Sequence, residues 1–226
     1  MKKLLSILLL SVFSVTVFAQ CNQYYVIKQG TTWEISNFSN KDKLEGKSIQ
    51  KVTEYKETSE GFEATLEIIS EDDKGEQVMA GSTKLLCENG VIRFDLRDVM
   101  PAETMESYEN FEMSVDGTNI ELPDNLKVGQ ELNDANVNFH IEASPMQINF
   151  KFNITDRKVL AEETLKVPAG SFDCFKVTQT VSMKMMMVVE STSVEWYAKE
   201  VGMIKSESYN KKGKLLSYSL LTNYTK

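Results

Sequence analysis

Apolar and polar side chains alternate along residues 175–189, and this alternation constrains the fold more than any other feature of the sequence. Seven of the eight residues taken in steps of two from Phe175 are apolar, whereas the intervening residues are mostly polar. Successive side chains of a β-strand point to opposite faces, so this pattern indicates a half-buried strand. The alternation breaks at Phe172 and Cys174, which predicts a β-bulge there. We therefore expect the odd-numbered residues from 175 to 189 to face the interior of a curved sheet.

Similar segments rich in Val, Ile, Thr and aromatic residues recur through the chain, separated by turn sequences such as Asn-Gly at 89–90 and the "VPAGSF" segment. One short helix is expected at 101–111, because Pro101 can occupy a first helical turn. The expected strands are 32–38, 47–56, 62–70, 77–86, 91–95, a hairpin within 111–122, 136–142, 147–155, 157–166, 172–189, 194–199, 203–209 and 215–224. The predicted fold class is all-β and mainly antiparallel, a single curved sheet forming a barrel or half-barrel with the short helix as a cap.

The first nineteen residues have the three parts of a secretory signal peptide: a basic start, an apolar run at 4–17, and a cleavage sequence that ends at Ala19. We therefore expect a signal peptide at 1–19 and one exported domain at 20–226, located in the periplasm or outside the cell. After cleavage no apolar segment is long enough to span a bilayer. The alternative is a lipoprotein acylated at Cys21, which we favour less because the preceding Gln20 is not a small residue.

The chain contains three cysteines, Cys21, Cys87 and Cys174, and an exported protein meets oxidising conditions. One disulfide would leave one free thiol. We predict a Cys21–Cys87 pair, because a residue at the start of the exported chain gains most from being tied down. The alternative is three unpaired, partly buried thiols. The cysteine spacings match no zinc site.

Met183, Met185 and Met187 would project from one side of the predicted strand, and their sulfur atoms allow two interpretations. Thioethers are suitable ligands for Cu(I). Such sites usually recruit a His or Cys, but His140, the single histidine, shares the polar face of its predicted strand with asparagines. We therefore favour an apolar wall, a role that suits flexible methionine side chains. Such a wall covers either a packed core or an apolar ligand.

The sequence lacks the motifs of common catalytic sites, including the G-x-S-x-G pattern, a phosphate loop and a dinucleotide fingerprint. The many carboxylates lie at turns and on polar strand faces, which indicates solvated charge rather than the acid pair of a glycosidase. Trp33 and Trp196 are interpreted as core residues rather than sugar-stacking residues. We therefore expect no enzymatic activity, no catalytic residues, no cofactor and no bound metal.

The formal net charge is −8, and loss of the two lysines in the signal peptide would make it −10. An acidic protein is poorly suited to bind the phosphate backbone through bulk attraction. The charge therefore predicts that nucleic acids are not partners.

Several segments resemble the TapB-like family of exported bacterial domains of unknown function. They are "ELPDNLKVGQEL", "ITDRKV", "TLKVPAGSFDCFKV" and "EWYAKEVGMIKSESYNKKGKLLSYSL", and the similarity includes Cys21 and the "CENGV" around Cys87. The resemblance implies an exported, mostly antiparallel β-barrel or half-barrel, similar in outline to periplasmic lipoprotein carriers, and it implies no catalytic residues. The methionine cluster corresponds to no motif of that family.

These observations favour an exported binding protein that holds a lipid or another apolar molecule in a concave β-sheet. The residues expected to line that surface are Val181, Met183, Met185, Met187, Val189, Trp196 and Met203. The alternative is a structural or interaction protein of the cell envelope, with a filled barrel and a protein partner. A Cu(I)-binding protein and a glycan-acting enzyme are the less favoured classes.

Overall fold

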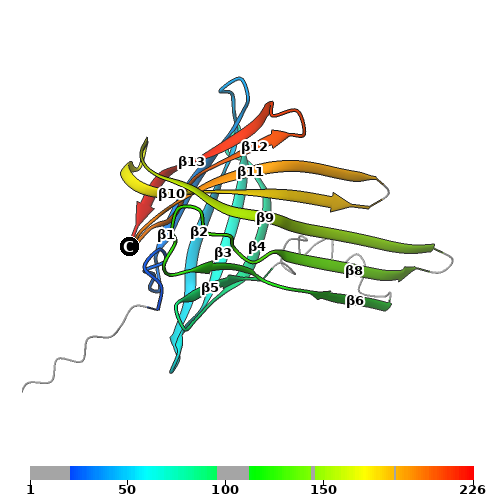
Figure 1. Ribbon diagram of the computed structural model, residues 1–226, viewed down its shortest axis with the longest axis horizontal. Coiled ribbons are helices and arrows are strands. Elements are labelled where there is room, and N and C mark those ends of the chain that lie inside the picture. The colour runs from blue at the N-terminus through cyan, green and yellow to red at the C-terminus, as the bar shows by residue number, and fades with distance from the viewer. Residues whose placement is uncertain (1–20, 96–111, 144–145, 186) are drawn as a thin grey trace, which may run out of the picture.

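The computed structural model describes residues 21–95, 112–143, 146–185 and 187–226, and all of its strands belong to one antiparallel sheet (Figure 1). The strands are β1 (Thr32–Ser39), β2 (Leu44–Glu57), β3 (Gly61–Asp72), β4 (Gln77–Glu88), β5 (Val91–Phe94), β6 (Glu112–Gly117), β7 (Ile120–Pro123), β8 (Ala135–Ala143), β9 (Met146–Val167), β10 (Gly170–Lys184), β11 (Val188–Ala198), β12 (Gly202–Asn210) and β13 (Leu215–Thr225). The predicted all-β, antiparallel fold class is confirmed. No helix occurs among the described residues, and the helix expected at 101–111 lies outside them.

The sheet is open, and its strand order is β6-β8-β9-β10-β11-β12-β13-β1-β2-β3-β4-β5-β7. Most neighbours are consecutive hairpin partners, but β13 returns to pair with β1, which joins the two ends of the described chain. The edge strands β6 and β7 are separated by only two residues of sequence. Figure 1 shows β8 and β9 projecting in a different direction from β2, β3 and β4, so the two walls of the sheet diverge towards one end.

Alternating burial explains why these segments form strands with one face towards the core. In β3, the side chains of Phe62, Ala64 and Leu66 are buried, whereas the intervening Glu63 and Thr65 are exposed or half-buried. Burial of such an apolar row is the main favourable contribution to packing of the sheet.

Two predicted strand boundaries are wrong in the second half of the chain. The expected strands 147–155 and 157–166 form the single strand β9, which continues through Asp156 with a backbone φ of 54°. Register shifts between β10 and β9 lie at Lys176/Val177 and between Thr178 and Thr180, not at the expected position near Phe172. A bulge accommodates an irregular residue without ending the strand, so Asp156 does not separate two strands as the sequence pattern predicts.

The expected strand 172–189 is also wrong at its far end. β10 ends at Lys184, and β11 begins at Val188 and pairs back with Lys184, so the chain reverses between these two residues. The turn contains none of the Gly, Asn, Asp or Pro residues that usually mark a hairpin. Because the alternation of apolar residues continues across it, the sequence pattern predicts one long strand. The methionine segment is therefore the tip of a hairpin rather than the middle of a long strand.

The main core lies at the end of the molecule where the segment before β1 enters the sheet. Tyr24, Tyr25 and Ile27 from this segment are buried against the sheet, and the Trp33 indole donates a hydrogen bond to the Val201 carbonyl at 2.6 Å. A second, smaller core lies along β8 and β9 and consists of Ala135, Val137, Phe139 and Ile154.

The structure contains a disulfide between Cys21 and Cys87, whose Cα atoms are 6.2 Å apart. It fastens the segment before β1 to β4. Cys174 is a free, buried thiol, and its burial raises its pKa to about 11. A thiol that is protonated and buried is a poor nucleophile, so Cys174 acts as a small apolar residue.

Candidate functional site

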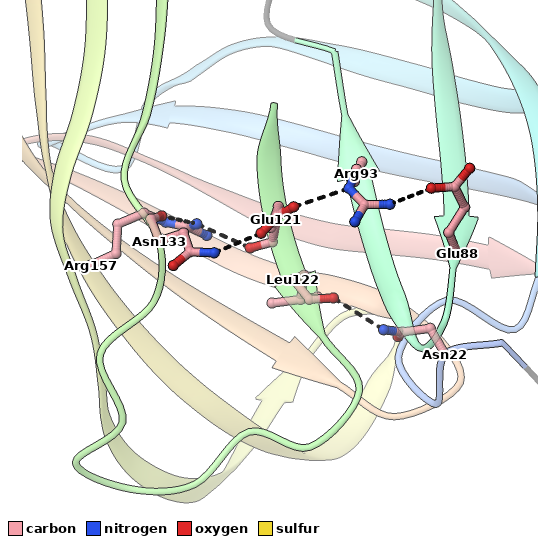
Figure 2. Close-up of polar contacts among 7 residues, drawn as sticks. All are labelled: Asn22, Glu88, Arg93, Glu121, Leu122, Asn133 and Arg157. Atoms are coloured by element: carbon pink, nitrogen blue, oxygen red, sulfur yellow. Dashed lines mark hydrogen bonds and ion pairs between the residues drawn. The ribbon is translucent and has the colours of Figure 1, made fainter. Parts of the chain in front are cut away.

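Side chains bridge the edge strand β7 to β5 on one side and to the segment before β8 and strand β9 on the other (Figure 2). On one side, Arg93 of β5 donates to Glu121 of β7 at 3.0 Å and to Glu88 of β4 at 2.8 Å. On the other side, Asn133 donates to the second oxygen of the Glu121 carboxylate at 2.8 Å. The Glu121 side chain therefore links strand β5 to the segment that precedes β8.

Arg157 of β9 completes the bridge from inside the sheet. Its Nη1 donates to the backbone carbonyls of Glu121 at 3.0 Å and of Asn133 at 2.8 Å, and its Nε donates to Gln179 at 3.1 Å. The residue is 2 % exposed, so these contacts are shielded from water. Because side-chain hydrogen bonds from a charged donor are strong, Arg157 holds β7 against β9 where no backbone ladder joins them.

The network continues into the interior through Gln179, which donates to Glu195 at 2.8 Å. Tyr197 donates to the other oxygen of the same carboxylate at 2.6 Å. Burial, together with the neighbouring negative charge of Glu195, raises the pKa of Tyr197 well above its ordinary value. The phenol therefore stays protonated and serves as a donor that fixes the position of Glu195.

The electrostatics of the bridge favour an ionised Glu121. The hydrogen bond from Asn133 lowers the pKa of this carboxyl, partial burial opposes the shift, and the hydrogen bond and charge of Arg93 lower the pKa further. A groove of about 770 Å³ lies beside the bridge. Its lining is polar and includes Arg93, Asp95, Glu121, Asn133, Asp134 and Asn136. This lining offers many hydrogen-bonding groups, and Val115 and Val137 add apolar surface to it.

A second candidate surface is the apolar face that β9, β10 and β11 share near the methionine hairpin. Directly paired residues lie on the same face, and Val181 pairs with Ile154, while Met183 pairs with both Phe152 and Val189. Gln179 lies on the same face of β10 and bonds Arg157, which reaches across to β7, so this is the inner face of the sheet.

The side chains on this face become more exposed to solvent along the strands towards the methionine hairpin. Ile154 is 3 % exposed, Phe150, Phe152 and Val181 are half-buried, and Met183 and Val189 are 40 % and 64 % exposed. We call the five residues Phe150, Phe152, Val181, Met183 and Val189 the apolar strip. The strip begins at the second core and ends in open surface, and none of its members is charged.

The seven residues expected to line a ligand surface do not form one surface. Val181, Met183 and Val189 share the apolar strip, whereas Met185 and Met187 lie in the turn beyond it, 58 % and 78 % exposed. Met203 packs against the main core.

Trp196 lies on the opposite face of the sheet, because it pairs with Lys176 rather than with Val177. Its ring is covered by the ammonium groups of Lys176 and Lys205, at 4.9 and 4.8 Å from the ring centroid, and its indole donates to Glu163. This agrees with its interpretation as a packed residue and removes it from the ligand surface.

Sequence reasoning missed Phe150, Phe152 and the Arg157 bridge. The two phenylalanines alternate with Lys151 and Asn153 in "NFKFN", a period-two signal of the same kind as that in β10. Arg157 interrupts an otherwise apolar strand face, and a charge at such a position indicates a buried interaction.

The described part of the chain contains neither a candidate metal-binding group nor a membrane-spanning helix. Within it, no three or more His, Cys, Asp or Glu side chains are grouped so as to hold a metal ion. The same described residues contain no helix long and apolar enough to cross a bilayer.

A family model described as DUF3108-like matches residues 28–221, which is most of the chain. The chain belongs to the DUF3108-like family. Comparison of this DUF3108-like protein with curated proteins yields no match. The resemblance to TapB-like proteins is not confirmed by these matches, which support the coarser expectation of an exported-type β domain of unknown function.

Two solved structures are similar to this DUF3108-like chain. One is a protein from Bacteroides fragilis named as exported and as having a YmcC-like fold; it is 23 % identical, has a TM-score of 0.73, and the match covers 91 % of this chain and 100 % of that one. The other is a protein from Parabacteroides distasonis named as a lipoprotein; it is 22 % identical, has a TM-score of 0.74, and the match covers 92 % and 100 %. At these identities the similarity shows the fold alone.

Proposed function

We propose that this DUF3108-like chain is an exported, non-catalytic protein that binds a lipid or another apolar molecule on the apolar strip. Export is supported by the signal-like residues 1–19 and by the names of the two proteins that share the fold. The strip provides the contact surface for the ligand, whereas Met185, Met187 and Trp196 take no part in it.

The observation that carries the proposal is the graded exposure of the strip. A core row that ended at the edge of the packed interior would be followed by polar residues on the same face. Here the row remains apolar from the half-buried Phe152 to Met183 and Val189, whose side chains are exposed to solvent. Apolar surface exposed in a concave sheet is what a ligand with little polarity would bury.

The experiment is native mass spectrometry of protein purified without detergent, followed by solvent extraction of any bound molecule. We expect a co-purifying apolar molecule with the wild-type chain. Met183→Asp places a charge in the strip at an already exposed position, so the variant should fold and lose occupancy by about tenfold. Val78→Asp is the matched control, because Val78 is 63 % exposed on β4, outside the strip.

A fluorescent fatty-acid analogue tests the same surface in the absence of a natural ligand. Enhancement of its fluorescence by wild type and by Val78→Asp, but not by Met183→Asp, supports the proposal. If folded wild-type protein yields no bound molecule and does not bind the analogue, the proposal is wrong.

A further inference from the structure

The exposed apolar side chains of the described chain are concentrated at the tip of the β10–β11 hairpin. Ten large apolar residues are exposed, and five of them, Met183, Met185, Met187, Val188 and Val189, lie within seven residues of sequence. The other five lie one each on β2, β4, the segment between β7 and β8, β9 and β13. Single exposed apolar residues are common on protein surfaces, but a contiguous cluster indicates an interaction surface.

The hairpin tip carries exposed apolar residues on both faces of the sheet. Val189 pairs with Met183 on the inner face, whereas Val188 pairs with Lys184 on the outer face, and Met185 and Met187 lie in the turn between them. A protein partner docking on a sheet would cover one face. A tip that is apolar on both faces is suited to a medium that surrounds it, such as the acyl-chain boundary of a bilayer.

The charges beside the tip have the opposite sign to the protein as a whole. Lys184 pairs directly with Lys151 of β9, and both side chains are exposed. The acidic residue that follows the tip, Glu190, forms an ion pair with Lys211 at 3.4 Å. In a chain of net charge −8, the two lysines form a local basic pair beside the apolar tip. Lysines at that position would meet anionic headgroups while the apolar tip enters the bilayer.

We infer that the β10–β11 tip docks the protein onto an anionic lipid bilayer, with Met185, Met187 and Val188 inserted and Lys151 and Lys184 at the headgroups. Figure 1 shows this hairpin and the β8–β9 hairpin extending to the same end of the molecule, away from the C-terminus. At that end, Met185 and Met187 are 58 % and 78 % exposed, so the tip is accessible from outside. The inference is separate from ligand binding on the apolar strip, because the inserted residues Met185, Met187 and Val188 are not members of the strip.

The test is flotation of the purified, non-acylated protein with vesicles of phosphatidylcholine alone or mixed with phosphatidylglycerol. We expect binding to the mixed vesicles that weakens as salt is added, because the lysine contribution is screened. The double variant Met185→Asp/Met187→Asp should reduce binding by about tenfold or more, since it places charges in the inserted segment. The double variant Val78→Asp/Leu216→Asp carries the same added charge on other exposed apolar residues and should keep most of the binding.

Two more variants separate the apolar and the charged contributions. Lys151→Gln/Lys184→Gln should remove the preference for anionic vesicles, with a loss of about fivefold or more. Met187→Trp supplies an indole at the most exposed tip position, and its emission should shift to the blue with vesicles and be quenched by lipids brominated in their acyl chains. Trp33 and Trp196 are buried, so their emission should change little.

Absence of wild-type binding to either kind of vesicle overturns the inference. Equal binding by both double aspartate variants overturns it as well, because the tip would then not be the docking element. These vesicle experiments contain no fluorescent ligand, so their failure leaves ligand binding on the apolar strip unaffected.

Discussion

The two ends of strand β10 carry the same alternation of side chains but lie in different environments. Near its start, Cys174 and Val177 are completely buried, on opposite faces of the strand. Near its end, Met183 is 40 % exposed, and Met185 in the adjoining turn is 58 % exposed. The alternation therefore specifies which side chains share a face, but what covers that face is decided by other parts of the chain.

The difference arises from what closes each end of the open sheet. At the packed end, the disulfide, the segment before β1 and the Arg157 bridge bring the two walls together. At the other end, β8 and β9 project away from β2 and β3 (Figure 1). We interpret the packed end as the source of stability and the exposed end as the surface for interaction, and each can be tested separately.

The largest expected effect comes from removing the covalent closure of the packed end. Cys21→Ser/Cys87→Ser opens a loop of 66 residues in the unfolded chain. The free energy of unfolding should fall by about 4 kcal/mol, because the crosslink no longer limits the entropy of the unfolded state. Urea denaturation of the oxidised wild type and the variant measures the change. Cys174→Ala, which keeps a small apolar side chain at the buried free thiol, is the control. The disulfide is unimportant for stability if the double variant unfolds at the wild-type midpoint.

The next largest effect should come from Arg157. Arg157→Met removes the guanidinium and leaves the carbonyls of Glu121 and Asn133 and the side chain of Gln179 without their donor. The expected loss is about 3 kcal/mol of unfolding free energy, the cost of unsatisfied buried acceptors. Arg93→Met is the matched control, because its guanidinium is more exposed and should cost about 1 kcal/mol. Equal losses in the two variants would show that Arg157 does not close the sheet.

The sequence predicts strands well where one local pattern determines burial, as it does for Phe62, Ala64 and Leu66 in β3. It fails at Met185–Met187 because a hairpin turn without a turn residue is held by pairing between strands, which the local pattern does not contain. The β13–β1 pairing joins Thr32 to Thr225, and no local signal specifies contacts over that separation. The candidate site was predicted in part for the same reason: Val181, Met183 and Val189 share parity, but Phe152 joins them only through strand register.

A matched pair of substitutions on the same hairpin compares the two ends directly. Val177→Ala removes two methyl groups from a side chain with no exposed surface, and it should cost about 2 kcal/mol of unfolding free energy. Val189→Ala makes the same chemical change where the side chain is 64 % exposed, and it should change the stability by less than about 0.5 kcal/mol. Thermal or urea unfolding of the two variants gives the comparison. Similar losses would mean that the exposed end is covered in solution, and the apolar strip would then not be free to bind a ligand.

The smallest effect concerns the pH dependence of the packed end, through Glu121. Its pKa is lowered in the folded protein, so the folded state binds the proton of this carboxyl less readily than the unfolded state does. The resulting stabilisation is present above the ordinary glutamate pKa of 4.5 and is lost as the pH falls through the lower, folded-state pKa.

Glu121→Gln keeps a side chain that can accept the Asn133 hydrogen bond but cannot titrate. Between neutral pH and acid the stability of this variant should fall less steeply than that of wild type, as measured by urea midpoints across the range. Glu54→Gln, at an exposed carboxylate of β2, should keep the wild-type slope. If Glu121→Gln keeps that slope as well, the Asn133 and Arg93 contacts do not hold the carboxylate in its ionised form, and the bridge depends on Arg157 alone.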